Sequence, residues 1–333
     1  MRGVGVEYSE FAAEKTPFPA TLLPLPQWLL WRGQEERTRQ GTPHLTTIPI
    51  TPQTLRVAST TDPRTWASSL SGVETLPAAL AAWQADNPDS SRGGGLGFVF
   101  TAHDPYVGID LDHVIDPTGT MQPWALPLVQ AFHPYPEVSP SSTGLHLLGR
   151  GTVGRGHKRG PIEGYDRARF FTRTGHPLDG SPPTLAAIQE PLAWLLPSME
   201  SVAKALDRHG ERFSSLFAGQ GQRTYPSQSE GDLALCRLAV QAGATAEQCE
   251  ALVRLSGLSR PKWDERHGSQ TYGQLTIATA LQGHRAPSKG PSRHRNGTPP
   301  EREAASRWPY RELPETAAVD DDLAQGACLW LEN

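Results

Sequence analysis

Two carboxylates at the end of one apolar run limit what this chain can fold into more than any other feature. The run reads Val107-Gly-Ile-Asp110-Leu-Asp112, and an earlier apolar run rich in β-forming residues extends from Leu96 to Phe100. Asp104-Pro105, between the two runs, is a turn signal. We therefore predict two strands joined by a short turn, with both carboxylates on the second strand.

The spacing of the two carboxylates places them on one face of that strand. Because side chains alternate between faces, Asp110 and Asp112 point the same way, while Ile109 and Leu111 point into a core. Two carboxylates on one face repel each other unless a cation lies between them, and Mg²⁺ or Mn²⁺ suits a set of oxygen ligands. The alternative is an ordinary surface strand with two solvated acids, and the pair alone does not decide between them.

The composition excludes several classes of protein. The chain has 333 residues, which suggests two domains, and its 32 glycines and 31 prolines indicate that part of it is loop or tail. A net charge of −4 excludes a uniformly basic protein but allows a local basic groove. Three widely spaced cysteines form neither a zinc-ligand spacing nor a disulfide framework, which indicates a cytoplasmic setting. No apolar run approaches the ~20 residues of a membrane span, so no membrane partner is expected.

The periodicity predicts an α+β chain. In the first half, Trp28 to Trp31 predicts a strand, followed by a polar loop from Arg32 to Thr46, and Ile48 to Ile50 closes a hairpin. Asp62-Pro63 predicts a helix start, and Leu76 to Trp83 a second helix.

The second half becomes mostly helical. Helical spacing occurs at Trp124 to Phe132 and at 184–208, and again in three runs after Asp232, where Thr245 is the expected N-cap of the middle helix and Gly257 its expected stop. Residues 209–230 are rich in Gly, Ser and Gln and are expected to be a linker. Residues 282–324 show no periodicity, which predicts a largely disordered tail.

Three segments together supply the parts of a nucleotidyl-transfer site. They are the Asp110/Asp112 strand, a Ser/Gly loop leading to a strand with His146, and a further strand with Glu163. Three carboxylates make a cage for one or two Mg²⁺ ions, an arrangement that suits in-line displacement at phosphorus. Donors and charges for a triphosphate are also present: Ser141, Ser142, Thr143, Lys158, Arg159, Arg167 and Arg169.

Each part has a plainer interpretation when taken alone. His146 stands between leucines and is then a core or edge histidine, and Glu163 is then a surface acid. Arg167 and Arg169 would only cover the sheet with their stems, and the Ser-rich loop would only be a turn. The joint arrangement favours function, because the acids, the histidine strand and the basic loop recur in an order that one active site would use.

The same three segments resemble the motifs of archaeo-eukaryotic primases, in particular the phage and plasmid primase-polymerases of the NrS-1 polymerase type. The matching motifs are 108–112, 139–146 and 162–175. The resemblance implies that Asp110, Asp112 and Glu163 hold the metal and that His146 contacts the phosphates of the incoming nucleotide. It also implies a catalytic domain that pairs a small α/β module with an RRM-like module, with the active site in the cleft between them.

The resemblance extends over roughly residues 26–281 and includes a helix-bundle domain, which in that family is implicated in starting a primer. The expected order is a lead-in at 1–25, a primase-polymerase domain at 26–200, a linker at 201–230, a helical bundle at 231–284 and a largely disordered tail at 285–333. Family members tend to carry lysines in the loop after the first Trp strand, where this chain has Arg37, Arg39 and His44. No zinc-binding Cys/His cluster and no helicase segment are evident, so a separate helicase is an expected partner.

The expected function is template-directed DNA synthesis on single-stranded DNA from nucleoside triphosphates, with Mg²⁺ or Mn²⁺, in phage or plasmid replication. His146, Ser142 and the basic residues Lys158, Arg159, Arg167 and Arg169 are the expected nucleotide contacts. Arg260, Lys262 and Trp263 are the expected template contacts, by charge and stacking, although they also suit a helix-connecting loop with a buried Trp. The alternatives are a metal-dependent phosphoesterase or nuclease, a non-catalytic DNA-binding replication protein, and a fragment of a larger primase-helicase.

Overall fold

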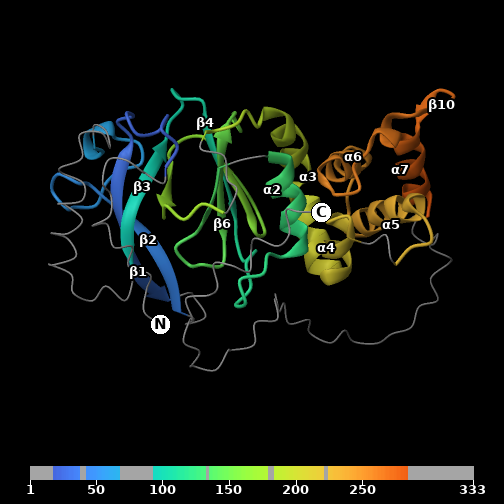
Figure 1. The fold of residues 1–333 in the computed structure, drawn as a ribbon, viewed down its shortest axis with the longest axis horizontal. Helices are drawn as coiled ribbons and strands as arrows, with labels where there is room; N and C mark the ends of the chain where they lie inside the picture. The colour runs from blue at the N-terminus through green and yellow to red at the C-terminus, as the bar shows by residue number, and fades with distance from the viewer. Residues whose placement is uncertain are drawn as a thin grey trace, which may run out of the picture.

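The computed structural model describes residues 18–37, 43–67, 93–132, 135–178, 184–220 and 224–283. These residues form a mixed α/β fold with two larger antiparallel sheets and several helices, in agreement with the predicted α+β class. Figure 1 shows the four-stranded sheet at the left, the five-stranded sheet in the middle and the helices at the right. Among the described residues, no helix is long and apolar enough to cross a membrane.

The four-stranded sheet has the order β2-β1-β3-β9. Its strands are β1 (Trp28–Arg37), β2 (Pro43–Ile50), β3 (Gly94–Phe100) and β9 (Arg169–Arg173). The prediction of a polar loop from Arg32 to Thr46 is wrong, because β1 and β2 continue through most of it as a paired hairpin. An antiparallel ladder that faces water tolerates polar side chains, so polarity alone did not mark a loop.

Three other expectations for the first part of the chain meet different outcomes. Asp62-Pro63 begins only the short 3-10 turn η2 (Pro63–Thr65), with the Asp62 side chain accepting from the Arg64 N–H, and no longer helix follows in the described segment. The helix predicted at 76–83 lies outside the described residues. The described end of the expected lead-in forms turns and buries Phe18 and Leu22 against the hydrophobic core around Trp28.

The five-stranded sheet has the order β5-β6-β4-β8-β7. Its strands are β4 (Tyr106–Leu111), β5 (Tyr135–Val138), β6 (Leu145–Arg150), β7 (His157–Arg159) and β8 (Ile162–Tyr165). The helices α2 (Leu126–Phe132) and α3 (Gln189–His209) share a core with one face of this sheet. Ile109 and Leu111 are fully buried in that core, as the alternation predicts.

The other face of the five-stranded sheet packs against the four-stranded sheet. Phe100 and Phe171 of the four-stranded sheet share a hydrophobic cluster with Tyr106 and Leu148 of the five-stranded sheet. The sheets approach closely at Gly108, where a Cβ atom would lie 2.4 Å from the Phe171 ring. Glycine is therefore required at this position of β4 for the two sheets to pack.

The helical part follows α3 and contains α4 (Glu211–Phe217), α5 (Gln228–Gln241), α6 (Ala246–Leu255) and α7 (Tyr272–Gln282). Short segments join the last two helices: η6 (Pro261–Asp264), β10 (Arg266–His267) and β11 (Gln270–Thr271). The predicted N-cap at Thr245 is confirmed, because its hydroxyl accepts from the Gln248 N–H. The predicted stop at Gly257 is also confirmed, since α6 ends at Leu255, Ser256 is its C-cap and Gly257 is the next residue.

The expected linker at 201–230 differs from the structure. α3 continues through it to His209, and α4 buries Phe213 and Phe217 in the core that also holds the helix faces of α5 and α6. The apolar residues Phe213, Leu216 and Phe217 have helical spacing, and they form the buried face of α4 although Gly, Ser and Gln are frequent in this stretch. The expected disordered tail at 285–333 lies outside the described residues.

Candidate active site

One row of polar side chains crosses the five-stranded sheet. The register places Glu137 opposite His146, His146 opposite Asp110, Asp110 opposite Glu163 and Glu163 opposite Lys158. Residues directly opposite each other on neighbouring strands share one face of a sheet. These five side chains, here called the polar row, therefore lie on the face away from α2 and α3, two positions along β4 from Gly108.

Asp110 stands in the middle of the polar row and has an unusual carboxyl group. Burial raises the pKa of Asp110 to about 8, and the negative charges of Asp112 and Glu163 act in the same direction, against Lys158 and Arg169. Asp112 lies in the turn just after β4, so the prediction that both carboxylates stand on the strand is wrong by one residue; its N–H donates to the Pro161 carbonyl over 2.8 Å. The three carboxyl groups thus gather within electrostatic reach of one another.

His146 is a buried neighbour of Asp110 with a fixed ring. Its Nδ1 lies 3.0 Å from the Thr172 carbonyl oxygen, and its ring packs against Phe171 with centroids 4.8 Å apart. Burial lowers the pKa of His146 to about 4, so the ring is neutral at pH 7. Because a carbonyl only accepts, Nδ1 carries the proton and Nε2 presents its lone pair towards Asp110, whose Oδ1 is 3.7 Å away.

Glu163 is held by donors on both of its oxygens. Lys158 pairs with Oε1, and the Tyr165 hydroxyl donates to Oε2 over 2.7 Å. Burial acts to raise the pKa of Glu163, but the hydrogen bonds from Lys158 and Tyr165 outweigh it and leave the pKa below its usual value. Arg169 completes this cluster, with its guanidinium 4.6 Å from the centroid of the Tyr165 ring and 3.7 Å from Glu163.

The structure brings some of the expected nucleotide contacts to the polar row and not others. Lys158 and Arg169 are there, whereas Arg159 pairs opposite Ile162 on the helix-facing side and lies 3.6 Å from Glu200 of α3. Arg167 occupies the turn between β8 and β9 and pairs with Asp166 over 2.8 Å. Arg159 therefore does not face the carboxylates in this arrangement.

The Ser-rich loop between β5 and β6 forms a tight turn. The Ser142 N–H donates to the Ser139 carbonyl over 2.9 Å, and Ser142 itself is exposed with a φ of 59°. The Ser139 hydroxyl accepts from the Gly144 N–H and bonds the Ser141 hydroxyl. The loop is thus ordered by its own hydroxyl groups next to the strand that carries His146.

The chemistry of the carboxylate group fits a divalent cation. As the side chains stand, no group of three or more His, Cys, Asp and Glu residues in the described part of the chain is close enough to hold a metal ion. The donors are nevertheless all oxygens, and Asp112 and Glu163 add negative charge beside the half-buried Asp110 carboxyl, which a divalent ion would offset. Glu163 would have to exchange its Lys158 contact for the ion.

The expected template contacts in the helical part are occupied by internal interactions. Arg260 donates to both oxygens of buried Asp232 over 2.8 and 2.6 Å, and Lys262 bonds the Ser229 hydroxyl. Trp263 is 2% exposed, and its Nε1–H donates to Glu250. A buried ring cannot stack on a base, so the stacking role expected for Trp263 is wrong for this arrangement, and the alternative of a buried anchor holds.

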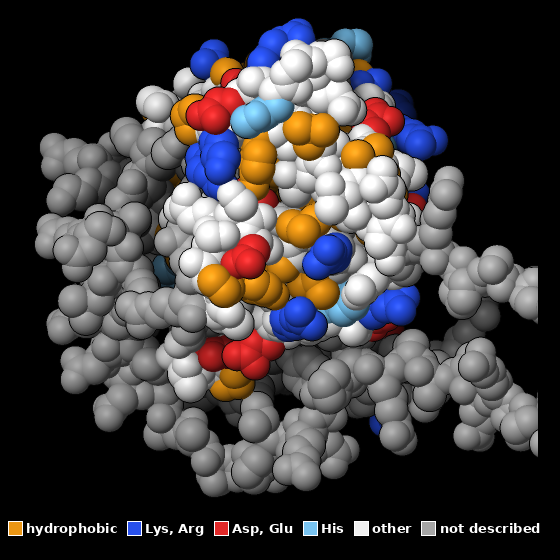
Figure 2. Space-filling view, turned by 90° about the vertical axis from the view of Figure 1, so that its right-hand side faces the viewer, with side chains coloured by type: hydrophobic (Ala, Val, Ile, Leu, Met, Phe, Trp, Pro, Cys, Tyr) orange, Lys and Arg blue, Asp and Glu red, His pale blue; other side chains and the backbone are white. Residues whose placement is uncertain are grey.

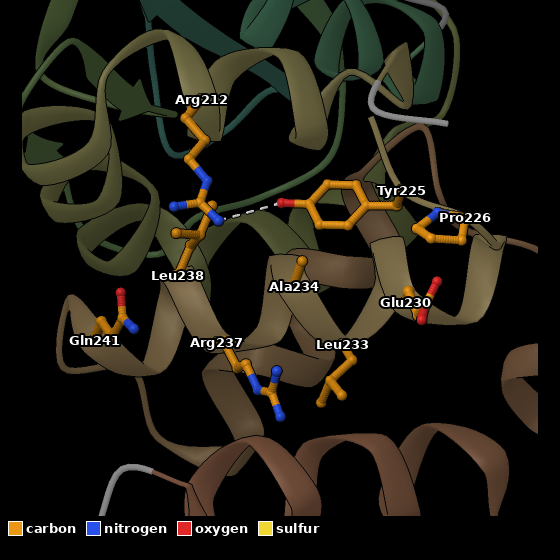
Figure 3. A pocket seen from close by; sticks show the side chains of 9 residues that line it. All are labelled: Arg212, Tyr225, Pro226, Glu230, Leu233, Ala234, Arg237, Leu238 and Gln241. Carbon is orange, nitrogen blue, oxygen red and sulfur yellow. Dashed lines mark hydrogen bonds between the residues drawn. The ribbon is translucent and has the colours of Figure 1, made fainter. Parts of the chain in front are cut away.

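The surface of the helical part is mixed in character. Figure 2 shows its described Lys and Arg side chains interspersed with acidic and hydrophobic ones. A hollow of about 300 Å³ lies between α4 and α5, and Figure 3 shows Arg212 and Tyr225 bonded at its edge. It is lined by Arg212, Tyr225, Pro226, Glu230, Leu233, Ala234, Arg237, Leu238 and Gln241. This hollow shares no residue with the polar row.

Sequence reasoning missed several residues around the polar row. Tyr165 follows Glu163 by two positions on the same strand, so alternation already placed it on the same face. Glu137 lies on β5, two positions before Ser139 of the Ser-rich loop, and no sequence motif marked it as a site residue. Arg173 and Thr172 could not have been linked to His146, because that contact depends on how the two sheets pack.

Two comparisons with known proteins bear on this site. Residues 228–287 match the family model of the NrS-1 polymerase HBD domain. The chain is also 29% identical over 275 residues to the DNA primase-polymerase of Nitratiruptor phage NrS-1, which covers 76% of this chain and 35% of that protein. The resemblance predicted from the motifs is therefore confirmed, and the chain spans about a third of the length of the relative it matches.

Proposed function

We propose that this chain is a template-directed nucleotidyltransferase that makes and extends primers on single-stranded DNA. The polar row carries the proposal, because it brings together Asp110, His146 and Glu163, which the primase motifs place in separate parts of the sequence, with Asp112 within electrostatic reach. The comparison with a phage primase-polymerase supports the same reaction class.

The strand order supports an RRM-like catalytic module. Four strands of the sheet, β5-β6-β4-β8, have the second-third-first-fourth order of RRM sheets, and α2 follows the first of them in the chain; β7 stands in the chain where a β-α-β-β-α-β series has its second helix. The four-stranded sheet would then belong to the smaller companion module, with the active site between the two. The domain divisions at 26–200 and 231–284 remain part of this proposal.

Asp110, Asp112 and Glu163 would hold the Mg²⁺ or Mn²⁺ ions. When bound, these ions lower the barrier to attack of a 3′-hydroxyl on the α-phosphate by neutralising charge on the attacking and leaving oxygens. Asp110 and Asp112 come from one segment and Glu163 from the neighbouring strand, so the sheet register fixes their separation. Burial of Asp110 excludes part of the water that would otherwise screen these charges.

The basic side chains around Glu163 suit the triphosphate. Lys158 lies at Oε1 of Glu163 and Arg169 at Oε2, and the side chains of both cations are more than half exposed. Once Glu163 turns to a metal ion, these two cations are free to bind phosphate oxygens, with Arg169 able to bind two oxygens at once. His146 presents Nε2 on the same face and Ser142 lies at the tip of the adjacent loop.

The same carboxylates would also suit a metal-dependent phosphoesterase or nuclease. We favour synthesis over hydrolysis, because the resemblance covers both the motifs and residues 228–287. Nucleoside triphosphates and single-stranded DNA are the proposed partners, and a separate helicase would open the duplex.

The test is incorporation of labelled nucleotide on single-stranded DNA with Mg²⁺ or Mn²⁺, with and without a primer. Asp110→Ala/Asp112→Ala is the inactive control, and Asp207→Asn, exposed on α3, is the matched control that should stay active. Products that vanish only in the double variant would support the proposal. Metal-dependent degradation of the template without incorporation would overturn it in favour of a nuclease.

Truncation is a poor way to test the helical part. α5 and α6 share a continuous core with α3 and the five-stranded sheet, so removing residues 231–281 would expose apolar surface of the catalytic part. Exposed point variants in the helical part, assayed with and without a primer, are the better measure of its role in initiation.

A further inference from the structure

A buried ion pair lies behind His146, on the side away from Asp110. Glu137 and Arg173 are both fully buried, and Arg173 Nη2 donates to Glu137 Oε1 over 2.8 Å. The Thr174 N–H donates to the other carboxylate oxygen over 3.2 Å, and Tyr135 also hydrogen-bonds this carboxylate. The Tyr135 ring lies 5.4 Å from the guanidinium.

This pair closes a ring of interactions that contains His146. Glu137 is the register partner of His146 on the neighbouring strand, and Arg173 directly follows Thr172 on β9. The Thr172 carbonyl belongs to the peptide group that joins Thr172 to Arg173, and it accepts from His146 Nδ1. The ring of interactions therefore runs from the His146 side chain through Thr172 and Arg173 to Glu137, and it returns to His146 through the pairing of β5 with β6.

The ring also joins the two sheets. β9 belongs to the four-stranded sheet and β5 to the five-stranded sheet, and the Thr174 hydroxyl donates to the Val138 carbonyl beside the ion pair. An anchored Arg173 holds the Thr172 carbonyl at a fixed position over β6. That position sets the orientation of the His146 imidazole, because the imidazole has few other polar contacts among the described residues.

Stability does not account for this pair. Burying two charges costs desolvation energy that their attraction often fails to recover, and well-packed apolar replacements are frequently as stable. For this pair the cost of desolvation is only partly recovered, because Nε and Nη1 of Arg173 are buried without a hydrogen-bond partner among the described residues. A directional role explains the pair better, since two apolar side chains could fill the space but could not hold a peptide group in one orientation.

We propose that Glu137 and Arg173 are positioning residues, which hold the Thr172 carbonyl so that the His146 ring keeps the orientation in which it faces the site of the incoming nucleotide. The kinetic part of this inference rests on the proposed function. The structural part, control of the His146 ring by the ion pair, does not.

The structural part is tested by NMR of the His146 Nδ1–H proton in the full chain. This resonance is identified by its loss in His146→Gln, and it should exchange slowly with water in the wild type. The test variant is Glu137→Met/Arg173→Met, which removes both charges together and so leaves no unpaired buried ion. We expect the resonance to shift and its exchange rate to rise at least about ten-fold, because the Thr172 carbonyl is no longer anchored. An unchanged shift and exchange rate in the folded variant would overturn the proposal.

The kinetic part is tested by KM and kcat for the incoming nucleotide. We expect the same double variant to raise KM by roughly ten-fold to a hundred-fold with a smaller change in kcat, because His146 contacts the bound triphosphate. In a His146→Gln background the double variant should add almost nothing, since the group that it positions is gone. Additive effects of the two changes would mean a general structural role and would overturn the proposal.

Arg64→Met/Asp62→Asn is the control, because it removes another two-bonded arginine–carboxylate pair, on the exposed turn after β2. It should leave the His146 resonance and the nucleotide KM unchanged. A wild type without incorporation would count against the proposed function alone, because the NMR measurement needs no activity. A wild type that incorporates nucleotide, together with an unchanged resonance in the double variant, would count against the ion pair alone.

Discussion

Asp110→Asn is expected to stabilise the metal-free protein at alkaline pH while abolishing nucleotide incorporation. The pKa of this carboxyl rises from 3.8 to about 8 on folding, so the folded state binds the proton more tightly than the unfolded chain does. The resulting stability is fully present below pH 4 and is lost as the pH rises through 8. At about 1.4 kcal/mol per pKa unit, the loss amounts to about 6 kcal/mol at most.

The assay is thermal unfolding in EDTA at pH 5.5 and pH 9. At pH 5.5 about 2 kcal/mol of this stability is already lost, because Asp110 ionises in the unfolded chain, whereas at pH 9 all of it is lost; the variant should therefore melt only slightly higher than the wild type at pH 5.5 and about 10–20 °C higher at pH 9. Asp207→Asn, exposed on α3, is the control and should follow the wild type at both values. Parallel melting of wild type and Asp110→Asn at both pH values would refute the reasoning.

Adding Mn²⁺ at pH 9 extends the same experiment to the metal. A bound ion stabilises the folded state by an amount set by its concentration and affinity. We therefore expect Mn²⁺ to raise the melting temperature of the wild type more than that of Asp110→Asn. Equal shifts in the two proteins would mean that the ion binds elsewhere.

Three further substitutions test the surroundings of the site. Gly108→Ala should destabilise the protein by about 1–3 kcal/mol and lower incorporation, because the new Cβ would overlap the Phe171 ring that packs on the histidine; unchanged melting and activity would contradict the close sheet packing. Arg169→Met should raise the nucleotide KM, while Arg159→Met, on the opposite face, should not; equal effects would contradict the assigned faces. Trp263→Phe should lower the melting temperature but leave single-stranded DNA affinity unchanged in an anisotropy titration, and lost affinity in the folded variant would restore the stacking role.

The strands that carry the site could be predicted because period-two alternation is a local property. Ile109 and Leu111 are buried where alternation placed them, and His146 and Glu163 lie on strands as expected. Lys158 and Arg159 were expected in a basic loop, whereas the structure places them on β7, where alternation turns them to opposite faces of the sheet.

Contacts that depend on register or on sheet packing could not be predicted from the sequence. Nothing local indicates that Asp110 pairs with His146 on one side and Glu163 on the other. The burial of Trp263 likewise depends on a distant residue, because Gly273 leaves room for the indole where a Cβ would lie 2.5 Å from it. In the sequence, Trp263 stands between a lysine and an aspartate, which is compatible with a surface or a buried position. Only its contact with Gly273 shows that it is buried.

α3 gives a physical route by which the helical part can affect the polar row. Towards the sheet, α3 packs Ala203 against Gly160 in the turn between β7 and β8, where a Cβ would lie 2.8 Å from the Ala203 methyl. That turn joins the strands that carry Lys158 and Glu163. Towards the helices, Trp194 of α3 lies under the Arg254 guanidinium of α6. Because α3 touches both, any repacking of α6 that displaces α3 would also displace the β7–β8 turn, so the position of Lys158 beside Glu163 depends on how α3 is held by the helical part as well as on the sheet.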